Sequence, residues 1–160
     1  MYGYDNDLRS QLIKTNVEYY GPRLTELDSG EKKTTWNWFA FLVPFCWLAY
    51  RKLYLECAVY YIVTNGLNTG ITQILANLGV AVNIGWTIDV LAMFFCGLYG
   101  NTLYKNRLDK LVVKCVELPE EEREKFIRRH GGTSVVAIIV AFCITISIAI
   151  LLYLLRTKVM

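Results

Sequence analysis

The sequence predicts an all-α integral membrane protein with about three transmembrane helices. An interfacial or re-entrant tryptophan-rich helix and short cytoplasmic amphipathic helices complete the expected fold. Hydrophobic residues make up 54% of the 160 residues, above the roughly 45–50% of a soluble domain. The excess lies in two blocks, because residues 53–104 contain no Lys or Arg and residues 131–155 contain no charged residue. Long apolar runs with few charges are typical of membrane spans.

Residues 1–33 are expected to form a cytoplasmic amphipathic helical segment. Apolar residues recur there at helical spacing, namely Leu8, Leu12, Ile13, Val17 and Tyr20. Such a stripe must be buried against a membrane surface or another helix. We expect the helix to end at Gly21-Pro22, a pair that is typical of turns. The polar start lacks the pattern of a secretory signal, which favours a cytoplasmic N-terminus.

Residues 34–52 contain a short, very apolar run, TTWNWFAFLVPFCWLAYRK. As a helix, Trp36 to Tyr50 would be only ~22 Å long, whereas the hydrocarbon core is about 30 Å thick. Pro44 favours a break in the middle, and basic pairs flank both ends. We interpret the run as an interfacial or re-entrant helix; the alternative is a short span. The residues expected to anchor the chain at the lipid interface are Trp36, Trp38, Trp47, Tyr50, Arg51, Lys52 and Trp86.

The remaining chain divides into three segments. Residues 53–104 read as a two-span transmembrane hairpin whose turn lies within Asn77–Gly85. Residues 105–131 read as a charged cytoplasmic helical connector, with a helix that starts at Pro119 and stops at Gly131. Residues 132–160 read as a third span and a short tail.

The orientation follows from the positions of the basic residues. Eight Lys and Arg lie between Lys105 and Arg129, whereas the turn before Trp86 has none. Cytoplasmic loops carry an excess of Lys and Arg, so we expect the connector and the N-terminus in the cytoplasm and the tail outside. If Trp36–Tyr50 spans the bilayer instead, the N-terminus lies outside while the connector stays inside.

Two carboxylates near the spans, Glu56 and Asp89, form a candidate polar intramembrane site. A functional interpretation is an ion or proton site. The structural interpretation is that both are interfacial and satisfied locally, since Glu56 follows Lys52 by four residues and Asp89 lies near a helix start. The structural interpretation is favoured, because neither acid has a second acid or a histidine beside it.

Small residues recur every four positions in two of the expected spans. They are Ala92, Cys96 and Gly100 in the second span, and Ala137, Ala141, Thr145 and Ala149 in the third. Helices in lipid associate through close approach at small residues. The two stripes are therefore expected to pack helices, either within one chain, which we favour, or against a partner.

Catalytic, cofactor and metal sites are not expected. The five cysteines are scattered without a C-x-x-C pair, and the single histidine, His130, has no evident metal-binding partners. No nucleotide-binding, zinc-protease or serine-hydrolase motif occurs. The connector has six acids among its basic residues and lacks interleaved aromatics, which argues against nucleic acid binding.

The run WNWFAFLVPFCWLAYRKLY, followed by GLYGNTLYKNRLDKL, resembles a family of small bacterial membrane proteins classed as a domain of unknown function. The positions that carry the resemblance are Trp36, Asn37, Trp38, Ala40, Phe41, Trp47, Tyr50, Arg51, Lys52, Tyr54, Asn101 and Tyr104. The resemblance covers Thr34 to Lys114 and implies the bacterial cytoplasmic (inner) membrane, with no implied activity. Some relatives carry an N-terminal zinc ribbon, for which this chain lacks the cysteines.

The expected function is therefore that of a non-enzymatic inner-membrane protein that acts by interaction, as a scaffold, regulator or accessory subunit. Its expected partners are the lipid bilayer and a membrane protein or further copies of itself. One alternative is an oligomeric small transporter or channel that uses Asp89 and polar residues of the first span. Another is an immunity-type protein against a membrane-active toxin.

Overall fold

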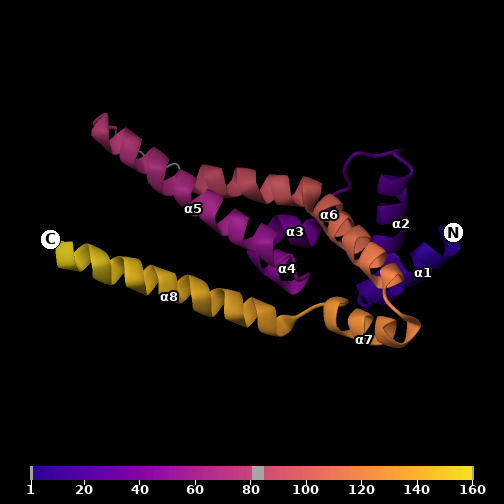
Figure 1. Ribbon diagram of the computed structural model, residues 1–160. Coiled ribbons are helices and arrows are strands. Elements are labelled where there is room, and N and C mark those ends of the chain that lie inside the picture. Colours follow the sequence, from indigo (N-terminus) through magenta and orange to yellow (C-terminus); the bar gives the residue numbers. More distant parts are fainter. Residues whose placement is uncertain (1, 81–84, 160) are drawn as a thin grey trace.

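The computed structural model describes residues 2–80 and 85–159, and within these ranges it contains helices and no strand (Figure 1). The helices are α1 (Tyr2–Ile13), α2 (Val17–Asp28), α3 (Trp38–Leu42), α4 (Pro44–Tyr50), α5 (Tyr54–Asn77), α6 (Gly85–Glu117), α7 (Glu120–His130) and α8 (Val135–Val159). The all-α class is confirmed. Part of the expected turn, residues 81–84, lies outside the described residues, as does Met160 in the expected tail.

The helices form two regions that α6 connects (Figure 1). At one end α1, α2 and α7 surround the C-terminal half of α6. At the other end α5, the N-terminal half of α6 and α8 project away from this bundle, and α3 and α4 lie between the two regions. The N-terminus belongs to the bundle, and the C-terminus lies at the far end of α8.

The expected single N-terminal helix is in fact two helices. It breaks at residues 14–16, where Lys14 and Asn16 have φ of 57° and 62°. The chain then continues as α2 straight through Gly21-Pro22, so the expected end at this pair is wrong. The apolar stripe is buried on both sides of the break, and Leu24 extends it beyond Pro22. Burial of Tyr20 and Leu24 therefore overrides the local turn preference of Gly-Pro.

The tryptophan-rich run also forms two helices. α3 ends and α4 begins at Val43-Pro44, with Pro44 in the first turn of α4. A proline suits this position because its missing N–H has no helical partner there. The break that Pro44 predicts is confirmed, although each of the resulting helices is too short to be a span.

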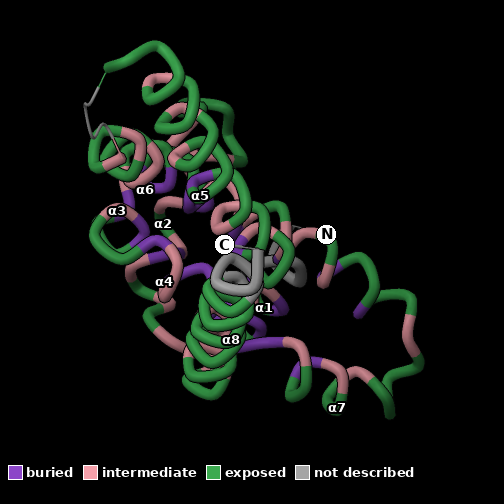
Figure 2. Tube along the Cα trace, turned by 90° about the vertical axis from the view of Figure 1, so that its left-hand side faces the viewer, coloured by how far each residue is buried: buried purple, intermediate pink, exposed green. Residues whose placement is uncertain are grey.

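The hydrophobic core lies in the bundle and beneath α4 (Figure 2). Its buried members include Leu12, Leu24, Trp47, Leu53, Tyr104, Leu108, Cys115 and Ile127. The C-terminal half of α6 contributes one residue per turn to this core, which is the spacing expected of a helix buried on one face.

Four charged side chains fasten α1 and α2 to α6. Arg9 and Lys105 each form ion pairs with both Asp28 and Asp109. Burial alone would raise the pKa of Asp28, but hydrogen bonds from Lys105 and Arg9 outweigh it and hold this pKa below its ordinary value. The network therefore fixes the register of the N-terminal helices on α6.

α7 follows the expected boundaries, whereas α8 begins as expected but continues through the expected short tail to Val159. α7 runs from just after Pro119 to His130, and Gly131 follows it as expected. The N–H of Gly132 donates to the carbonyl of Leu12 at 2.6 Å, which ties the link between α7 and α8 to α1. α8 then runs outward, almost without contact with the bundle (Figure 1).

Candidate functional site

Most residues of the projecting helices are exposed (Figure 2), and many of these residues are large and apolar. These include Leu55, Ile62, Leu67 and Ile74 on α5, Trp86, Leu91 and Phe95 on α6, and Val136, Ile139, Ile146 and Leu151 on α8. Soluble monomers rarely expose contiguous apolar patches of more than a few hundred Å². An apolar surface spread over three helices is therefore a surface that binds something.

The exposed apolar residues of α5 and α8 begin at the starts of these helices. On α6 their continuous run ends at Tyr99, with Val113 and Val116 exposed further along. The N–H of Ser134, just before α8, donates to the carbonyl of Tyr50, just before α5, at 2.9 Å. Lys52 Nζ donates to the carbonyl of Gly131 at 2.7 Å, and Arg107 Nη2 of α6 donates to the carbonyl of His130 at 2.8 Å. The starts of α5 and α8 thus meet the middle of α6, and positive charge gathers where they meet.

Arg51 precedes Lys52 but lies inside the protein, at 1% exposure. Its guanidinium lies 4.3 Å from the ring centroid of Tyr20 and 5.1 Å from that of Tyr104. Both Nη atoms donate to the carbonyl of Thr15 at 3.3 Å, and Nη1 also donates to Tyr104 Oη at 3.4 Å. No carboxylate pairs with it among the described residues. Aromatic faces and a carbonyl therefore replace the usual counter-ion.

The turn between α1 and α2 explains where this carbonyl comes from. Thr15 lies between Lys14 and Asn16, the two residues with left-handed backbone conformations. The turn delivers the Thr15 carbonyl to Arg51. The break in the expected N-terminal helix thus has a structural role, since it supplies an acceptor to a buried cation.

Two buried asparagines join the tryptophan-rich run to α6. Asn37 Nδ2 donates to Asn101 Oδ1 at 2.8 Å, and Asn37 Oδ1 accepts from the N–H of Ala40 at 3.0 Å, which caps α3. Asn101 Nδ2 donates in turn to Thr35 Oγ1 at 2.9 Å. Because both amides are fully buried and bonded, they fix α3 at one position on α6.

Gly100, the last residue of the small-residue stripe on α6, faces α3. A Cβ placed on Gly100 would lie 2.8 Å from the Cβ of Ala40. Cys96 is buried and lies near Cys57 and Tyr60 of α5, and Ala92 is half-buried. In the structure this stripe accommodates a helix of its own chain and does not meet the stripe of α8.

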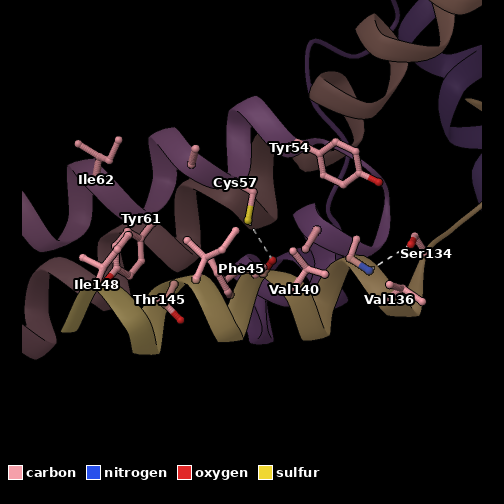
Figure 3. Close-up of a pocket in the computed structure, with 15 residues that line it drawn as sticks. Phe45, Tyr54, Cys57, Tyr61, Ile62, Ser134, Val136, Val140, Thr145 and Ile148 are labelled. Carbon is pink, nitrogen blue, oxygen red and sulfur yellow. Dashed lines mark hydrogen bonds between the residues drawn. The ribbon is translucent and has the colours of Figure 1, made fainter. Parts of the chain in front are cut away.

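The stripe of α8 faces an apolar groove of about 540 Å³ between α5 and α8 (Figure 3). Ala137, Ala141 and Thr145 line one side, and Cys57 and Tyr61 line the other. Ala149 is exposed beyond it. The residues that line the groove carry no charge. It is shaped to receive an apolar segment.

The residues expected to anchor the chain at the lipid interface lie in different environments. Trp38 and Trp86 are on the surface, at 61% and 69% exposure, and Trp36, Tyr50 and Lys52 are half-buried. Trp47 and Arg51 are instead inside the protein, where Trp47 Nε1 donates to Tyr20 Oη at 3.2 Å. For these two residues the environment differs from the expected one, because the N-terminal helices cover them.

Glu56 and Asp89 do not come together. Glu56 lies in the first turn of α5, near the basic side chains of Lys52 and Arg107. Asp89 is exposed on α6, and its Oδ1 accepts from Asn68 Nδ2 of α5 at 3.1 Å. Each acid is thus in a separate, local environment.

Sequence reasoning missed the role of Tyr20 and Arg107 in this region. In the sequence Tyr20 was only part of an apolar stripe. In the structure its hydroxyl accepts a hydrogen bond from Trp47, and its ring packs against the guanidinium of Arg51. Arg107 appeared only as one charge of the connector. The one sequence feature that could have identified Arg107 is its position, because it is a basic residue one helical turn after Tyr104.

Among the residues that the structure describes, no three His, Cys, Asp or Glu side chains lie close enough to hold a metal ion. No individual helix in the described ranges combines the length and apolarity of a membrane span, whereas α7 and Val135–Leu151, bent by 50° at their junction, meet these criteria as a pair.

A family model described as a protein of unknown function (DUF2628) matches residues 8–110, which hold the Arg51 and asparagine clusters. No curated protein and no solved structure matches the chain. The chain belongs to the DUF2628 family, which confirms the resemblance to a domain of unknown function.

Proposed function

We propose that this member of the DUF2628 family is a multi-pass protein of the bacterial inner membrane that acts by interaction, without catalysis of its own. In this proposal α5, the N-terminal half of α6 and α8 lie in lipid, and α1, α2 and α7 form a cytoplasmic bundle. The observation that carries the proposal is the apolar surface of the three projecting helices, which begins at the starts of α5 and α8 and whose continuous run on α6 ends at Tyr99.

The charge distribution supports the orientation. Lys52, Lys105, Arg107 and Lys110 lie at or just beyond this end of the apolar surface, on the side of the bundle. Cationic side chains are enriched at the cytoplasmic face of membrane proteins. Trp38 and Phe39 of α3 are exposed, and α3 packs on Gly97 and Gly100 at the end of the apolar run of α6, which suits an interfacial helix.

The apolar groove between α5 and α8 is the proposed interaction surface, and its occupant is an uncharged transmembrane helix of a partner. Two features support this choice. The lining is apolar and uncharged, and the row Ala137, Ala141 and Thr145 permits close approach of a helix backbone. In lipid, such close packing replaces the hydrophobic drive that operates in water.

The membrane proposal is tested by extraction. The protein should sediment with membranes after carbonate and urea washes and should require detergent for a monodisperse preparation. A cysteine-accessibility assay should label Lys125→Cys from the cytoplasmic side only. A preparation that stays monodisperse without detergent would refute the membrane placement.

The interaction proposal is tested by photocrosslinking in native membranes. A photoreactive amino acid at Ile144, which lines the groove, should crosslink to a discrete partner, whereas the same group at the exposed Ile146 should not. Ala141→Leu, which fills the groove, should abolish the Ile144 product. Cys143→Leu adds similar bulk outside the groove and serves as the matched control.

The mass of the crosslinked product identifies the partner class. A product of twice the chain mass indicates a second copy of this chain, and another mass indicates a different membrane protein. Equal crosslinking at both positions, or a product that persists in Ala141→Leu, would contradict the proposed groove.

A further inference from the structure

A second groove, of about 530 Å³, lies where α5 begins and α6 leaves the apolar region. Four cationic side chains line it, namely Lys52, Arg107, Lys110 and Lys114, together with Glu56 and Leu55. Neither the proposed partner helix nor the family match assigns it a role. Its chemistry is distinct from that of the uncharged groove.

Arg107 is held in place and only partly satisfied. Its Nη2 donates to the carbonyl of His130, while Nη1 is buried and has no hydrogen-bond partner. Burial lowers the pKa of this guanidinium, and Tyr104, Tyr54 and Glu56 offset part of that effect. A buried charged N–H without an acceptor is costly, so the site favours an added acceptor.

Lys52 is also fixed by the fold. It has a φ of 59°, and its ammonium donates to the carbonyls of Arg129 and Gly131 at 3.1 and 2.7 Å. Burial lowers its pKa first, and the positive charges of Arg107 and Lys14 lower it further. The cations around the groove therefore repel one another, which a bound anion would relieve.

Glu56 offsets only part of this charge. It is the one carboxylate among the residues that line the groove, and in the described ranges it forms no ion pair with any of the four cations. The groove therefore has a surplus of positive charge beside Leu55, a side chain that is 73% exposed on the apolar surface of α5.

We propose that this groove binds the phosphate group of an anionic phospholipid, with Arg107, Lys110 and Lys114 facing the headgroup and Leu55 beside an acyl chain. Basic pockets at the cytoplasmic ends of membrane helices bind phosphate-bearing headgroups in this way. The proposal rests on the membrane placement above. Free phosphate shares the same chemistry, so the test separates the two sources.

The test uses the purified full chain in a neutral detergent and follows its melting temperature. Added phosphatidylglycerol should raise the melting temperature, and phosphatidylcholine with the same acyl chains should not. Lys110→Gln with Lys114→Gln should weaken phosphatidylglycerol binding roughly thirtyfold, since each cation near such a surface contributes about 1 kcal/mol.

Lys125→Gln with Arg128→Gln removes the same charge from the exposed face of α7, outside the groove, and should leave binding unchanged. Glu56→Gln removes the opposing carboxylate and should strengthen binding. An equal loss in the two double variants, or an equal response to the two lipids, would overturn the proposal.

An inorganic phosphate arm identifies the source. A melting shift with inorganic phosphate that phosphatidylglycerol does not reproduce would assign the groove to free phosphate and overturn the lipid assignment. All of these melting experiments use a chain that requires detergent. Failure of the lipid proposal is therefore distinct from failure of the membrane proposal, in which the chain would stay monodisperse in buffer without detergent.

Discussion

Replacement of Gly100 by Ala tests whether α3 packs directly on α6. The new Cβ would lie 2.8 Å from the Cβ of Ala40 and 3.4 Å from two ring atoms of Trp47. The Ala40 Cβ is attached directly to the backbone of α3, so relief requires movement of the helix. Overpacking of this kind costs about 1–3 kcal/mol.

A second glycine, at a position without a clash, serves as a control that separates the packing cost from the effect of alanine on helix propensity. Gly70 lies within α5, and a Cβ there meets nothing within 4 Å. Gly70→Ala should therefore raise the unfolding free energy by up to ~1 kcal/mol, because alanine favours the helix. Gly100→Ala receives the same gain but also incurs the clash, so the two variants should differ by about 1–3 kcal/mol.

The assay is thermal or denaturant unfolding of both variants in the same detergent. For a chain of this size 1 kcal/mol corresponds to roughly 2–4 °C in melting temperature, so Gly100→Ala should melt several degrees below Gly70→Ala. Gly100→Leu should destabilise the chain further. A Gly100→Ala variant that melts at or above Gly70→Ala would refute the packing of α3 on this face.

Three further perturbations test other parts of the structure. Asn101→Leu should reduce the unfolding free energy by about 2 kcal/mol or more, since it leaves the buried amide of Asn37 without its acceptor; unchanged denaturant unfolding would contradict the buried amide pair. Burial and then the neighbouring cations lower the pKa of His130 below 6.5, so stability should fall as the pH drops from about 6.5 through that folded-state pKa. His130→Asn should flatten this pH profile, and an equal slope in the variant would exclude the histidine as its cause. Asp89→Asn should change stability by less than ~0.5 kcal/mol, because its contact is exposed; loss of ion flux in reconstituted vesicles would instead favour the transporter alternative.

The sequence predicts the long helices because their signals are local. Apolar blocks, Pro44, Pro119 and Gly131 each act within one or two turns of themselves, and α5 and α7 begin and end close to the expected residues. The candidate groove between α5 and α8 follows in part from the small residues of α8. Periodicity places them on one face without identifying what that face meets.

Contacts between distant residues were beyond such reasoning. Asn37 and Asn101 are 64 positions apart, and no local pattern pairs them. Arg51 was expected at a lipid interface because arginines flanking apolar runs usually lie there. The burial of Arg51 depends on the turn at Lys14–Asn16 between α1 and α2, because this turn supplies the Thr15 carbonyl as a hydrogen-bond acceptor. The local turn preference of Gly21-Pro22 likewise gave way to the burial of α2.

Three consecutive residues link the two grooves. Tyr50 accepts the N–H of Ser134 and so sets where α8 starts, Arg51 fills the aromatic core, and Lys52 binds the end of α7 while lining the basic groove. An anion at Arg107 would relieve the repulsion between Arg107 and Lys52, which both donate to carbonyls at the end of α7, and would so stabilise the link that holds α8 beside α5. Lipid binding in the basic groove and helix binding in the apolar groove should therefore be coupled, because both depend on this one segment.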